Sequence, residues 1–219
     1  MKLYSGPLSL FSRKVEIALA EKGLAFERVM VPFSQAEGYF PKHPDVLSTN
    51  PKGQVPVFID GDLTLFDSTV INEYLEDAYP DPPILPGSPK MRARCRLLEL
   101  TADEILLPDV VRLMHRTEPP NPDPAVQGAK EEDALLAEAD IANRYEALDH
   151  QLAGSDYFFG VFTAADIAIF MVMLFAKRLG APGFGSHNAL SAWYARIADR
   201  PSVVHILREV AETDRSLSP

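Results

Sequence analysis

The 219-residue sequence contains a single cysteine, Cys95, which excludes a framework of internal disulfides. Such sparing use of cysteine is typical of a reducing compartment. Basic residues are also scarce, with 21 Lys and Arg against 31 Asp and Glu, so the formal net charge is −10. Because nucleic acids and anionic membranes are polyanions, neither is an expected partner of a chain with no basic run.

Long apolar segments are missing as well. The longest, residues 167–176, has ten residues, whereas a membrane-spanning helix needs about 20. The first residues, MKLYSGPLS, lack the pattern of a signal peptide. We therefore expect a soluble, cytoplasmic protein with no membrane partner.

Two common kinds of ligand-binding pattern are absent from the sequence. The five histidines show no metal-ligand spacing with cysteine or carboxylate residues, so no metal site is predicted. The 12 glycines are scattered and form no phosphate-binding loop. Metal-assisted and nucleotide-dependent chemistry are therefore not indicated.

Proline, by contrast, is abundant, and its 19 residues are clustered. The segment 79–89, YPDPPILPGSP, carries five prolines and a glycine and is typical of an inter-domain linker. The character of the sequence changes on either side of it. We predict a first domain at residues 1–79, a linker at 80–89 and a second domain at 90–219.

Short β-type and helical patterns alternate in the first domain, and a strand–helix–strand unit requires a parallel pair of strands. A tight Asp60-Gly61-Asp62 turn then joins two strands in an antiparallel hairpin. The domain is therefore expected to have a mixed four-stranded sheet. The predicted elements are strands at 2–5, 27–31, 55–59 and 63–66 and helices at 12–22 and from Asp67-Ser68 onward.

Only helical patterns are legible in the second domain. The first of them, at 90–118, contains Pro108, which should kink it. The helix at 164–179 is apolar nearly all round and should be the buried axis of the domain. It opens with a Thr163–Asp166 capping box, a structural signal. The remaining helices are predicted at about 126–152, 189–199 and 202–212.

The sequence NPKGQVP, residues 50–56, places Pro56 near the start of a strand. A proline there can simply open the strand, because it lacks the N–H that a ladder requires. Alternatively, the Val55–Pro56 bond is cis and leaves the backbone of Val55 unpaired at the end of the sheet. An unpaired backbone of this kind can bind an extended peptide.

These features in this order resemble the cytosolic glutathione transferases, over essentially the whole chain. The shared features are a thioredoxin-like first half with NPKGQVP and Asp67-Ser68, a proline-rich linker, and an all-helical second half with FTAAD. The resemblance implies an α/β domain followed by an all-α domain. It also implies a cis Val55–Pro56 bond, with the valine backbone paired to the cysteinyl backbone of glutathione.

The same resemblance assigns the other contacts to glutathione. Asp67 and Ser68 would bind the γ-glutamyl end, although the family usually has Glu or Gln at the first position. Gln54 would lie near the glutathione backbone, and Lys42 would pair with the glycyl carboxylate. For Lys42, an ordinary solvated loop lysine is the alternative.

Catalysis in this family depends on a hydroxyl or thiol beside the glutathione sulfur. Serine-type members have their serine at the position of Ser9, and cysteine-type members have a thiol there; tyrosine-type members have tyrosine at the position of Leu8. Ser12 is the competing candidate, although it also suits the helix N-cap. Ser9 itself could be a plain loop serine. Cys95, far along the chain, is expected to be inert packing unless Arg94 and Arg96 acidify it.

The implied reaction is attack of the glutathione thiolate on a small hydrophobic electrophile by a homodimeric enzyme that uses no metal. The electrophile would lie near Leu10, Phe11, Met114 and His115. Dehalogenation, ether cleavage and isomerisation are alternative outcomes of the same thiolate chemistry. A non-catalytic interaction or regulatory protein that keeps the fold is the rival hypothesis.

Overall fold

The computed structural model describes residues 1–40 and 42–217. The chain divides into two compact units. The first combines residues 1–84 with the chain from Ala198 onward, and the second is Leu85–Ile197. The last helix therefore groups with the first 84 residues, whereas the sequence-based division placed all of residues 90–219 in one helical domain.

The first unit contains a four-stranded sheet in the order β2-β1-β3-β4. Strand β1 pairs in parallel with β2 and antiparallel with β3, and β3 pairs antiparallel with β4. The predicted mixed sheet is confirmed. The third strand begins two residues later than predicted, because Pro56 has no N–H to contribute to the ladder. The strands are β1 (Lys2–Ser5), β2 (Glu27–Met30), β3 (Val57–Asp60) and β4 (Leu63–Phe66).

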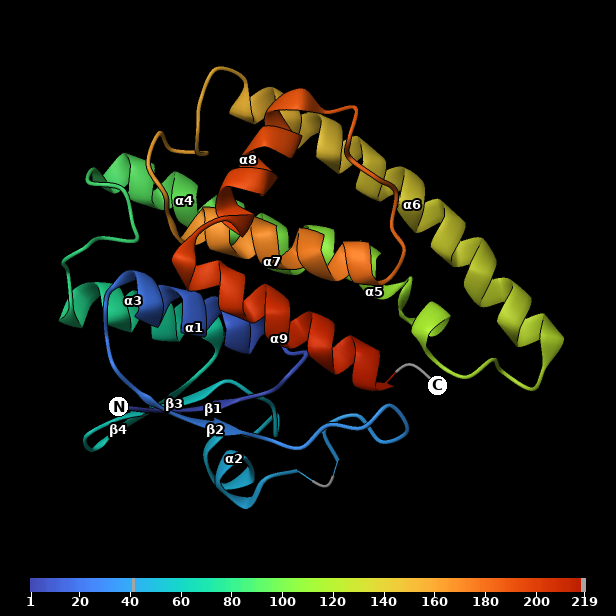
Figure 1. Ribbon diagram of the computed structural model, residues 1–219, viewed down its shortest axis with the longest axis horizontal. Coiled ribbons are helices and arrows are strands. Elements are labelled where there is room, and N and C mark those ends of the chain that lie inside the picture. Colours follow the sequence, from blue (N-terminus) through green and yellow to red (C-terminus); the bar gives the residue numbers. More distant parts are fainter. Residues whose placement is uncertain (41, 218–219) are drawn as a thin grey trace. The chain divides into compact units, whose positions relative to one another are not determined.

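Three helices accompany the sheet within this part of the chain. Helices α1 (Leu10–Glu21) and α3 (Ser68–Ala78) lie on one face, and the short α2 (Pro44–Thr49) lies on the other (Figure 1). Helix α2 was not predicted, because six residues are too few to show a helical period. The core of this unit is apolar and fully buried: Leu3, Val15, Ile17, Val57, Phe58, Ile71 and Leu75.

Helix α9 (Pro201–Leu217) belongs to the first unit and buries Val203, Ile206 and Val210. Charged groups also join it to α1 and β2. The Arg13 guanidinium is almost fully buried and lies 2.7 Å from both Glu16 and Glu209. Arg28 of β2 lies 2.8 Å from the same Glu209 carboxylate. At the other end of α9, Glu21 accepts hydrogen bonds from Arg200. A sequence pattern could not reveal these pairs, since the partners lie far apart in the chain.

Acid should therefore loosen α9. Burial raises the pKa values of Glu21 and Glu209, but hydrogen bonds from arginines outweigh it, so both pKa values lie below the ordinary 4.5. Stability from such depressed carboxyls is present above the unfolded-state pKa and is lost as the pH falls through the folded-state pKa. We expect the α9 amides to lose protection against hydrogen exchange selectively below about pH 4, after correction for intrinsic exchange.

The internal control for this measurement is α7 (Ala164–Arg178), which carries neither of the two carboxyls. A Glu21→Gln/Glu209→Gln double variant should show weakened α9 protection already at neutral pH and little further change in acid. Equal loss of protection in α7 and α9 would contradict the assignment.

The second unit is helical throughout its regular structure (Figure 1). The single kinked helix predicted at 90–118 is instead a succession of segments. A π-helical stretch, Ala102–Leu106, comes immediately before Pro108, because a proline inside a helix removes a backbone donor and its ring crowds the preceding turn. The elements are α4 (Pro89–Thr101), η1 (Ala102–Leu106), α5 (Leu107–Val111), η2 (Met114–Thr117), α6 (Pro124–Leu152), α7 (Ala164–Arg178) and α8 (Asn188–Ala198).

Helix α7 is buried along nearly its whole length, which confirms the predicted axis of the helical unit. The Thr163–Asp166 capping box is present at its start. Asp166 is fully buried and also accepts a hydrogen bond of 2.8 Å from the indole of Trp193 on α8. Among the described residues, no helix has both the length and the apolar character needed to cross a membrane.

Candidate functional site

The register of the sheet brings four chain segments to one end of it. Tyr4 of β1 lies opposite Val57 of β3, and Val57 lies opposite Phe66 of β4. Ser5 lies beside Met30, where β2 ends. The segments that follow β1, β2 and β4, and the segment that precedes β3, therefore meet at the same end of the sheet. Every residue predicted to bind glutathione or to activate its sulfur lies in one of these segments.

The segment after β1 carries Ser9, which is the N-cap of α1. Its Oγ accepts a hydrogen bond from the Ser12 backbone N–H at 3.2 Å and one from the Ser12 hydroxyl at 3.1 Å. The expectation that Ser12 caps the helix is therefore wrong. The helix begins earlier than its apolar pattern, so the earlier serine takes the capping position, and Ser12 is fully buried in the first turn.

This arrangement leaves Ser9 with one unused hydrogen-bonding capability. A hydroxyl has one donor and two acceptor lone pairs. Both acceptor positions of Ser9 are occupied by Ser12, so the proton of Ser9 is the group that can still bind a ligand. Ser9 is half-buried, and its position at the start of α1 adds the partial positive charge of a helix N-terminus. These features together suit an anion.

The loop that leads to Ser9 is held from two sides. The Arg13 guanidinium donates a hydrogen bond to the Pro7 carbonyl at 3.1 Å, and the Leu8 N–H donates to the Tyr39 hydroxyl at 3.0 Å. The Tyr39 ring lies so close to Gly6 that a Cβ there would come within 2.5 Å of it. Only glycine therefore fits at position 6 without displacing the ring.

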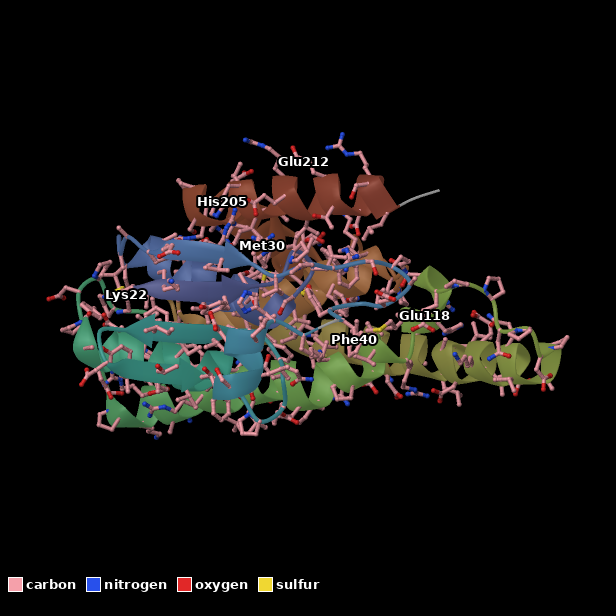
Figure 2. All side chains as sticks on the ribbon, turned by 90° about the horizontal axis from the view of Figure 1, so that it is seen from below. Lys22, Met30, Phe40, Glu118, His205 and Glu212 are labelled. Carbon is pink, nitrogen blue, oxygen red and sulfur yellow. The ribbon has the colours of Figure 1, made fainter. Side chains whose placement is uncertain are left out.

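Tyr39 and Arg13 are the site residues that sequence reasoning missed. Tyr39 lies in the segment after β2, between Met30, the last residue of that strand, and Phe40, both labelled in Figure 2. Neither residue forms part of a sequence motif. Each contacts the backbone of the loop before Ser9, and such a contact leaves no recognisable sequence pattern. Their contacts could be found only from the fold.

The segment before β3 contains the cis Val55–Pro56 peptide bond. The strand registers begin at Val57, so no described strand pairs with Val55. The Asn50 side-chain amide holds the preceding turn by donating to the Gln54 carbonyl at 2.7 Å. The Gln54 side chain itself is exposed. Backbone at this end of the sheet is thus held in place but remains available to a ligand.

Lys42 lies close to this same segment. A Cβ at Gly53 would be 3.8 Å from Lys42 Cγ, so the stem of the lysine runs beside the turn that precedes Gln54. The side chain is half-buried rather than fully solvated. The fold therefore brings Lys42, Gln54 and Val55 together, although 11 residues separate the first from the second.

The segment after β4 contains Asp67 and Ser68. Asp67 caps α3, as the sequence predicted, and its Oδ1 accepts from the N–H groups of Thr69 at 3.0 Å and Val70 at 3.3 Å. Its φ of 75° lies in the left-handed region, which is uncommon for a residue other than glycine and is concentrated at functional sites. Within the described residues no hydrogen bond is made by Asp67 Oδ2, which leaves that oxygen for a ligand.

Comparison with known proteins agrees with this geometry. The sequence pattern of the family described as "Glutathione S-transferase, N-terminal domain" matches residues 3–83, and that of "Glutathione S-transferase, C-terminal domain" matches residues 104–201. This chain belongs to the glutathione S-transferase family. The two matches cover both halves of the chain and place the glutathione-binding fold in the first.

Relatives of this glutathione S-transferase family member carry two kinds of name. A stringent starvation protein A homolog of Coxiella burnetii is 46% identical over 98 residues, which is 45% of this chain and only 44% of that relative. Glutathione S-transferase PARB of Nicotiana tabacum is 32% identical, over 96% of this chain and 98% of the relative. A glutathione S-transferase crystal structure from Rhodospirillum rubrum F11 is 28% identical with a TM-score of 0.78, covering 94% of this chain and 91% of that one.

Two further residues of this glutathione S-transferase family member, Cys95 and His115, have chemically versatile side chains. Cys95 is fully buried, and burial raises the pKa of its thiol to about 11, so the neighbouring arginines do not activate it. Both ring nitrogens of His115 are engaged: Nδ1 lies 3.2 Å from the Arg112 carbonyl and Nε2 lies 2.8 Å from Glu131. The imidazole is therefore already bonded within its own unit. Among residues 1–40 and 42–217, no cluster of His, Cys, Asp and Glu could hold a metal ion.

Proposed function

We propose that this chain is a glutathione transferase in which the Ser9 hydroxyl donates a hydrogen bond to the sulfur of bound glutathione. The donation lowers the pKa of the thiol, and the thiolate then attacks a small hydrophobic electrophile. The observation that carries the proposal is the pair of hydrogen bonds from Ser12 to Ser9 Oγ, because they direct the remaining Ser9 proton toward a ligand.

The tripeptide would bind across the end of the sheet. Val55 supplies backbone N–H and C=O groups to the cysteinyl residue, since no described strand uses them. Ser68 and the first amides of α3 suit the γ-glutamyl carboxylate. Asp67 Oδ2 suits the ammonium group, and Lys42, beside Gln54, suits the glycyl carboxylate. Each end of the ligand thus meets a group of complementary charge.

Hydrogen bonding and the helix dipole can together ionise the glutathione thiol without a general base or a metal. A hydrogen bond to a charged group contributes roughly 1.5–3 kcal/mol, equivalent to about one to two pKa units. The N-terminus of α1 adds about 0.3–1 kcal/mol. A free thiol with a pKa of about 8.5 would then be roughly half ionised or more at pH 7. Positioning and anion stabilisation account for the reaction.

The oligomeric state, the cellular location and the class of substrate are inferred from the family. Members bind glutathione and electrophilic substrates and are typically dimeric, and we propose a cytoplasmic homodimer for this chain. Dehalogenation, ether cleavage and isomerisation use the same thiolate and differ only in the electrophile. The second candidate function is a non-catalytic regulatory role, which the relatives named stringent starvation protein A homolog favour.

Binding and ionisation of glutathione test the proposal directly. We expect calorimetry to show one glutathione site per chain in the millimolar range or tighter, and ultraviolet titration of the bound thiol to show a pKa about one to two units below that of free glutathione. Ser68→Ala should weaken binding about tenfold, because it removes a charge-assisted hydrogen bond.

Ser186→Ala is the matched control, since that serine is exposed in the helical unit. It should leave glutathione binding and thiol ionisation unchanged. If no binding is measurable at millimolar glutathione, the transferase proposal fails and the regulatory role is favoured. Binding without any shift in the thiol pKa would retain the site but refute the role of Ser9.

A further inference from the structure

We infer that Arg13 is a positioning residue for the proposed transferase reaction. It fixes the orientation of the peptide bond between Pro7 and Leu8, and thereby holds the Ser9 hydroxyl where it meets the glutathione sulfur. This role rests on the proposed function, because Arg13 acts on the sulfur only through Ser9. The contacts that carry it lie within the first unit of the chain.

Residues 6–9 form a β-turn that leads directly into α1. The Ser9 N–H donates to the Gly6 carbonyl at 3.1 Å, so Pro7 and Leu8 are the two central residues of the turn. Proline holds a negative φ at the first central position, and Leu8 does not have a positive φ at the second. The turn is therefore type I, because a type II turn requires a positive φ at its second central residue.

Type I and type II turns differ in the orientation of the central peptide, which here is the one between Pro7 and Leu8. Proline at the first central position is compatible with both types, so Pro7 does not choose between them. A flip changes ψ of Pro7 and φ of Leu8, and the chain at Ser9 must shift to accommodate the change. A misplacement of about 1 Å can lower a reaction rate about 100-fold, so the orientation of this peptide matters for Ser9.

Both ends of this peptide have a side-chain partner. The Arg13 guanidinium donates to the Pro7 carbonyl at 3.1 Å, and the Leu8 N–H donates to the Tyr39 hydroxyl at 3.0 Å. A flip would turn the carbonyl toward Tyr39, whose hydroxyl can donate as well as accept. It would also turn the N–H toward Arg13, whose guanidinium has five donors and no acceptor. Arg13 is therefore the partner that opposes the flip.

The Arg13 guanidinium is itself held in place from two helices. Its side chain is 1% exposed and lies 2.7 Å from Glu16 of α1 and 2.7 Å from Glu209 of α9. Each of these carboxylates has a second partner, because Ser5 donates to Glu16 and Arg28 lies 2.8 Å from Glu209. Helix α9 thus supports the turn before Ser9 through a single buried guanidinium.

Arg13→Lys tests the inference on the full chain. Lysine keeps the positive charge beside Glu16 and Glu209, but one ammonium group cannot reproduce the planar set of contacts that includes the Pro7 carbonyl. We expect the pKa of the bound glutathione thiol to rise by about half a unit to one unit. The value of kcat/KM should fall about three- to tenfold at neutral pH, with the affinity for glutathione unchanged. This shift of the pH profile is a result that a purely structural role of Arg13 would not produce.

Leu8→Gly and Leu8→Ala, each made with and without Arg13→Lys, test the turn itself. Both remove the leucine side chain, but only glycine adopts a positive φ freely. With Arg13 present the two Leu8 variants should give similar thiol pKa values. With Arg13→Lys, Leu8→Gly should raise the pKa further than Leu8→Ala does, because the flip is then opposed by neither residue.

Nuclear magnetic resonance reports the flip without glutathione. The nuclear Overhauser effect between the Pro7 Hα and the amide proton of residue 8 is strong in a type II turn and weak in a type I turn. It should become strong only when Leu8→Gly and Arg13→Lys are combined. Because no glutathione is needed, this measurement tests the turn even if the proposed transferase function fails.

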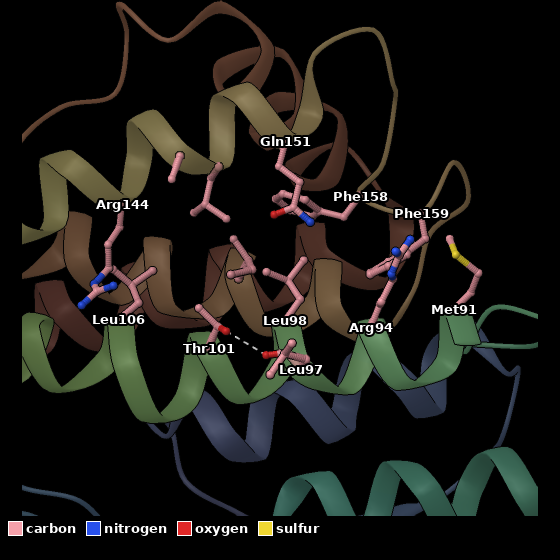
Figure 3. Close-up of a pocket in the computed structure, with 13 residues that line it drawn as sticks. Met91, Arg94, Leu97, Leu98, Thr101, Leu106, Arg144, Gln151, Phe158 and Phe159 are labelled. Atoms are coloured by element: carbon pink, nitrogen blue, oxygen red, sulfur yellow. Dashed lines mark hydrogen bonds between the residues drawn. The ribbon is translucent and has the colours of Figure 1, made fainter. Parts of the chain in front are cut away.

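Two arginine variants are the controls. Arg28→Lys is the matched one, since Arg28 contacts the same Glu16 and Glu209 carboxylates but, within the described residues, makes no hydrogen bond to the turn. Arg94→Lys is the remote one, because Arg94 lies on α4 in the second unit, where it lines a cavity (Figure 3). Both should leave the thiol pKa and kcat/KM unchanged.

Two outcomes would overturn the inference. An equal rise of the thiol pKa in Arg13→Lys and Arg28→Lys would show that the carboxylates matter rather than the turn peptide. A weak Overhauser effect in the combined Leu8→Gly and Arg13→Lys variant would show that Arg13 does not choose the turn type. If circular dichroism shows that Arg13→Lys does not fold, Arg13→Gln/Glu16→Gln, which removes both charges of the buried pair, replaces it in every comparison.

Discussion

Replacing Ser9 by glycine or alanine is expected to raise the pKa of the glutathione thiol in the complex by about one to two units. The hydroxyl proton that stabilises the thiolate is lost in both variants. At neutral pH the ionised fraction should fall from roughly half to a few per cent. The value of kcat/KM for conjugation should fall about tenfold or more, with little change in the affinity for glutathione.

Comparing the alanine and glycine variants of Ser9 separates the effect of the lost hydroxyl on the thiol pKa from the effect of the lost N-cap on helix stability. Ser9 also caps α1 through its side chain. Alanine removes the cap at a cost of about 1 kcal/mol, whereas glycine costs only a few tenths. An equal pKa rise in both variants would therefore be due to the hydroxyl. Ser9→Thr keeps the hydroxyl and should restore most of the activity.

Ser12→Ala is the matched control for this prediction. It removes the hydroxyl that donates to Ser9 Oγ but leaves the Ser12 backbone N–H in place. We expect a smaller rise in the thiol pKa than with Ser9→Ala. If Ser12→Ala restored the pKa of free glutathione and Ser9→Ala did not, the sulfur contact would belong to Ser12 and the assignment would be wrong.

The position of the N-cap, at Ser9 rather than at Ser12, shows where sequence reasoning reaches its limit. Serine before an apolar-periodic run is a good N-cap signal, and two serines three positions apart both satisfy it. Which one caps depends on where the preceding loop ends. That position is set by contacts of Arg13 with Pro7 and of Tyr39 with Leu8, and neither contact leaves a local pattern in the sequence.

The elements that are specified by residues close together in the sequence were predicted correctly. The hairpin through Asp60-Gly61-Asp62 and the Thr163–Asp166 capping box depend on neighbours in the chain, and both are present. The placement of α9 depends instead on Arg13 and Glu209, which are 196 positions apart. The candidate glutathione site shows the same difference between local sequence motifs and contacts made only by the fold. The segments around Val55 and Ser68 carry motifs, whereas Tyr39 is brought to the loop by the fold alone.

The largest effect on stability is expected at Asp166. Its carboxylate is fully buried and accepts four hydrogen bonds: from the Thr163 N–H and hydroxyl, both at 2.8 Å, from the Phe158 N–H at 3.3 Å, and from the Trp193 indole at 2.8 Å. Burial raises the pKa of Asp166 above its ordinary value, although the donors oppose the rise. A single carboxylate thus joins the loop before α7, the start of α7, and α8.

Asp166→Ala should lower the free energy of unfolding by about 3–5 kcal/mol, because it leaves several buried donors without an acceptor. Asp166→Asn should cost somewhat less, since its oxygen still serves one pair of donors while its NH₂ group opposes the other. Urea unfolding followed by Trp193 fluorescence measures the effect at the site itself, and circular dichroism checks the helices.

Asp149→Asn is the matched control, because Asp149 accepts a single hydrogen bond from the Leu190 N–H at 2.8 Å and the asparagine oxygen can replace it. It should cost less than about 1 kcal/mol. Trp193→Phe, which removes one of the four donors, should cost less than Asp166→Ala when circular dichroism is used for both. If Asp166→Ala were no more destabilising than Asp149→Asn, the four hydrogen bonds would not be stabilising the helical unit, and the buried carboxylate would require a role other than a structural one.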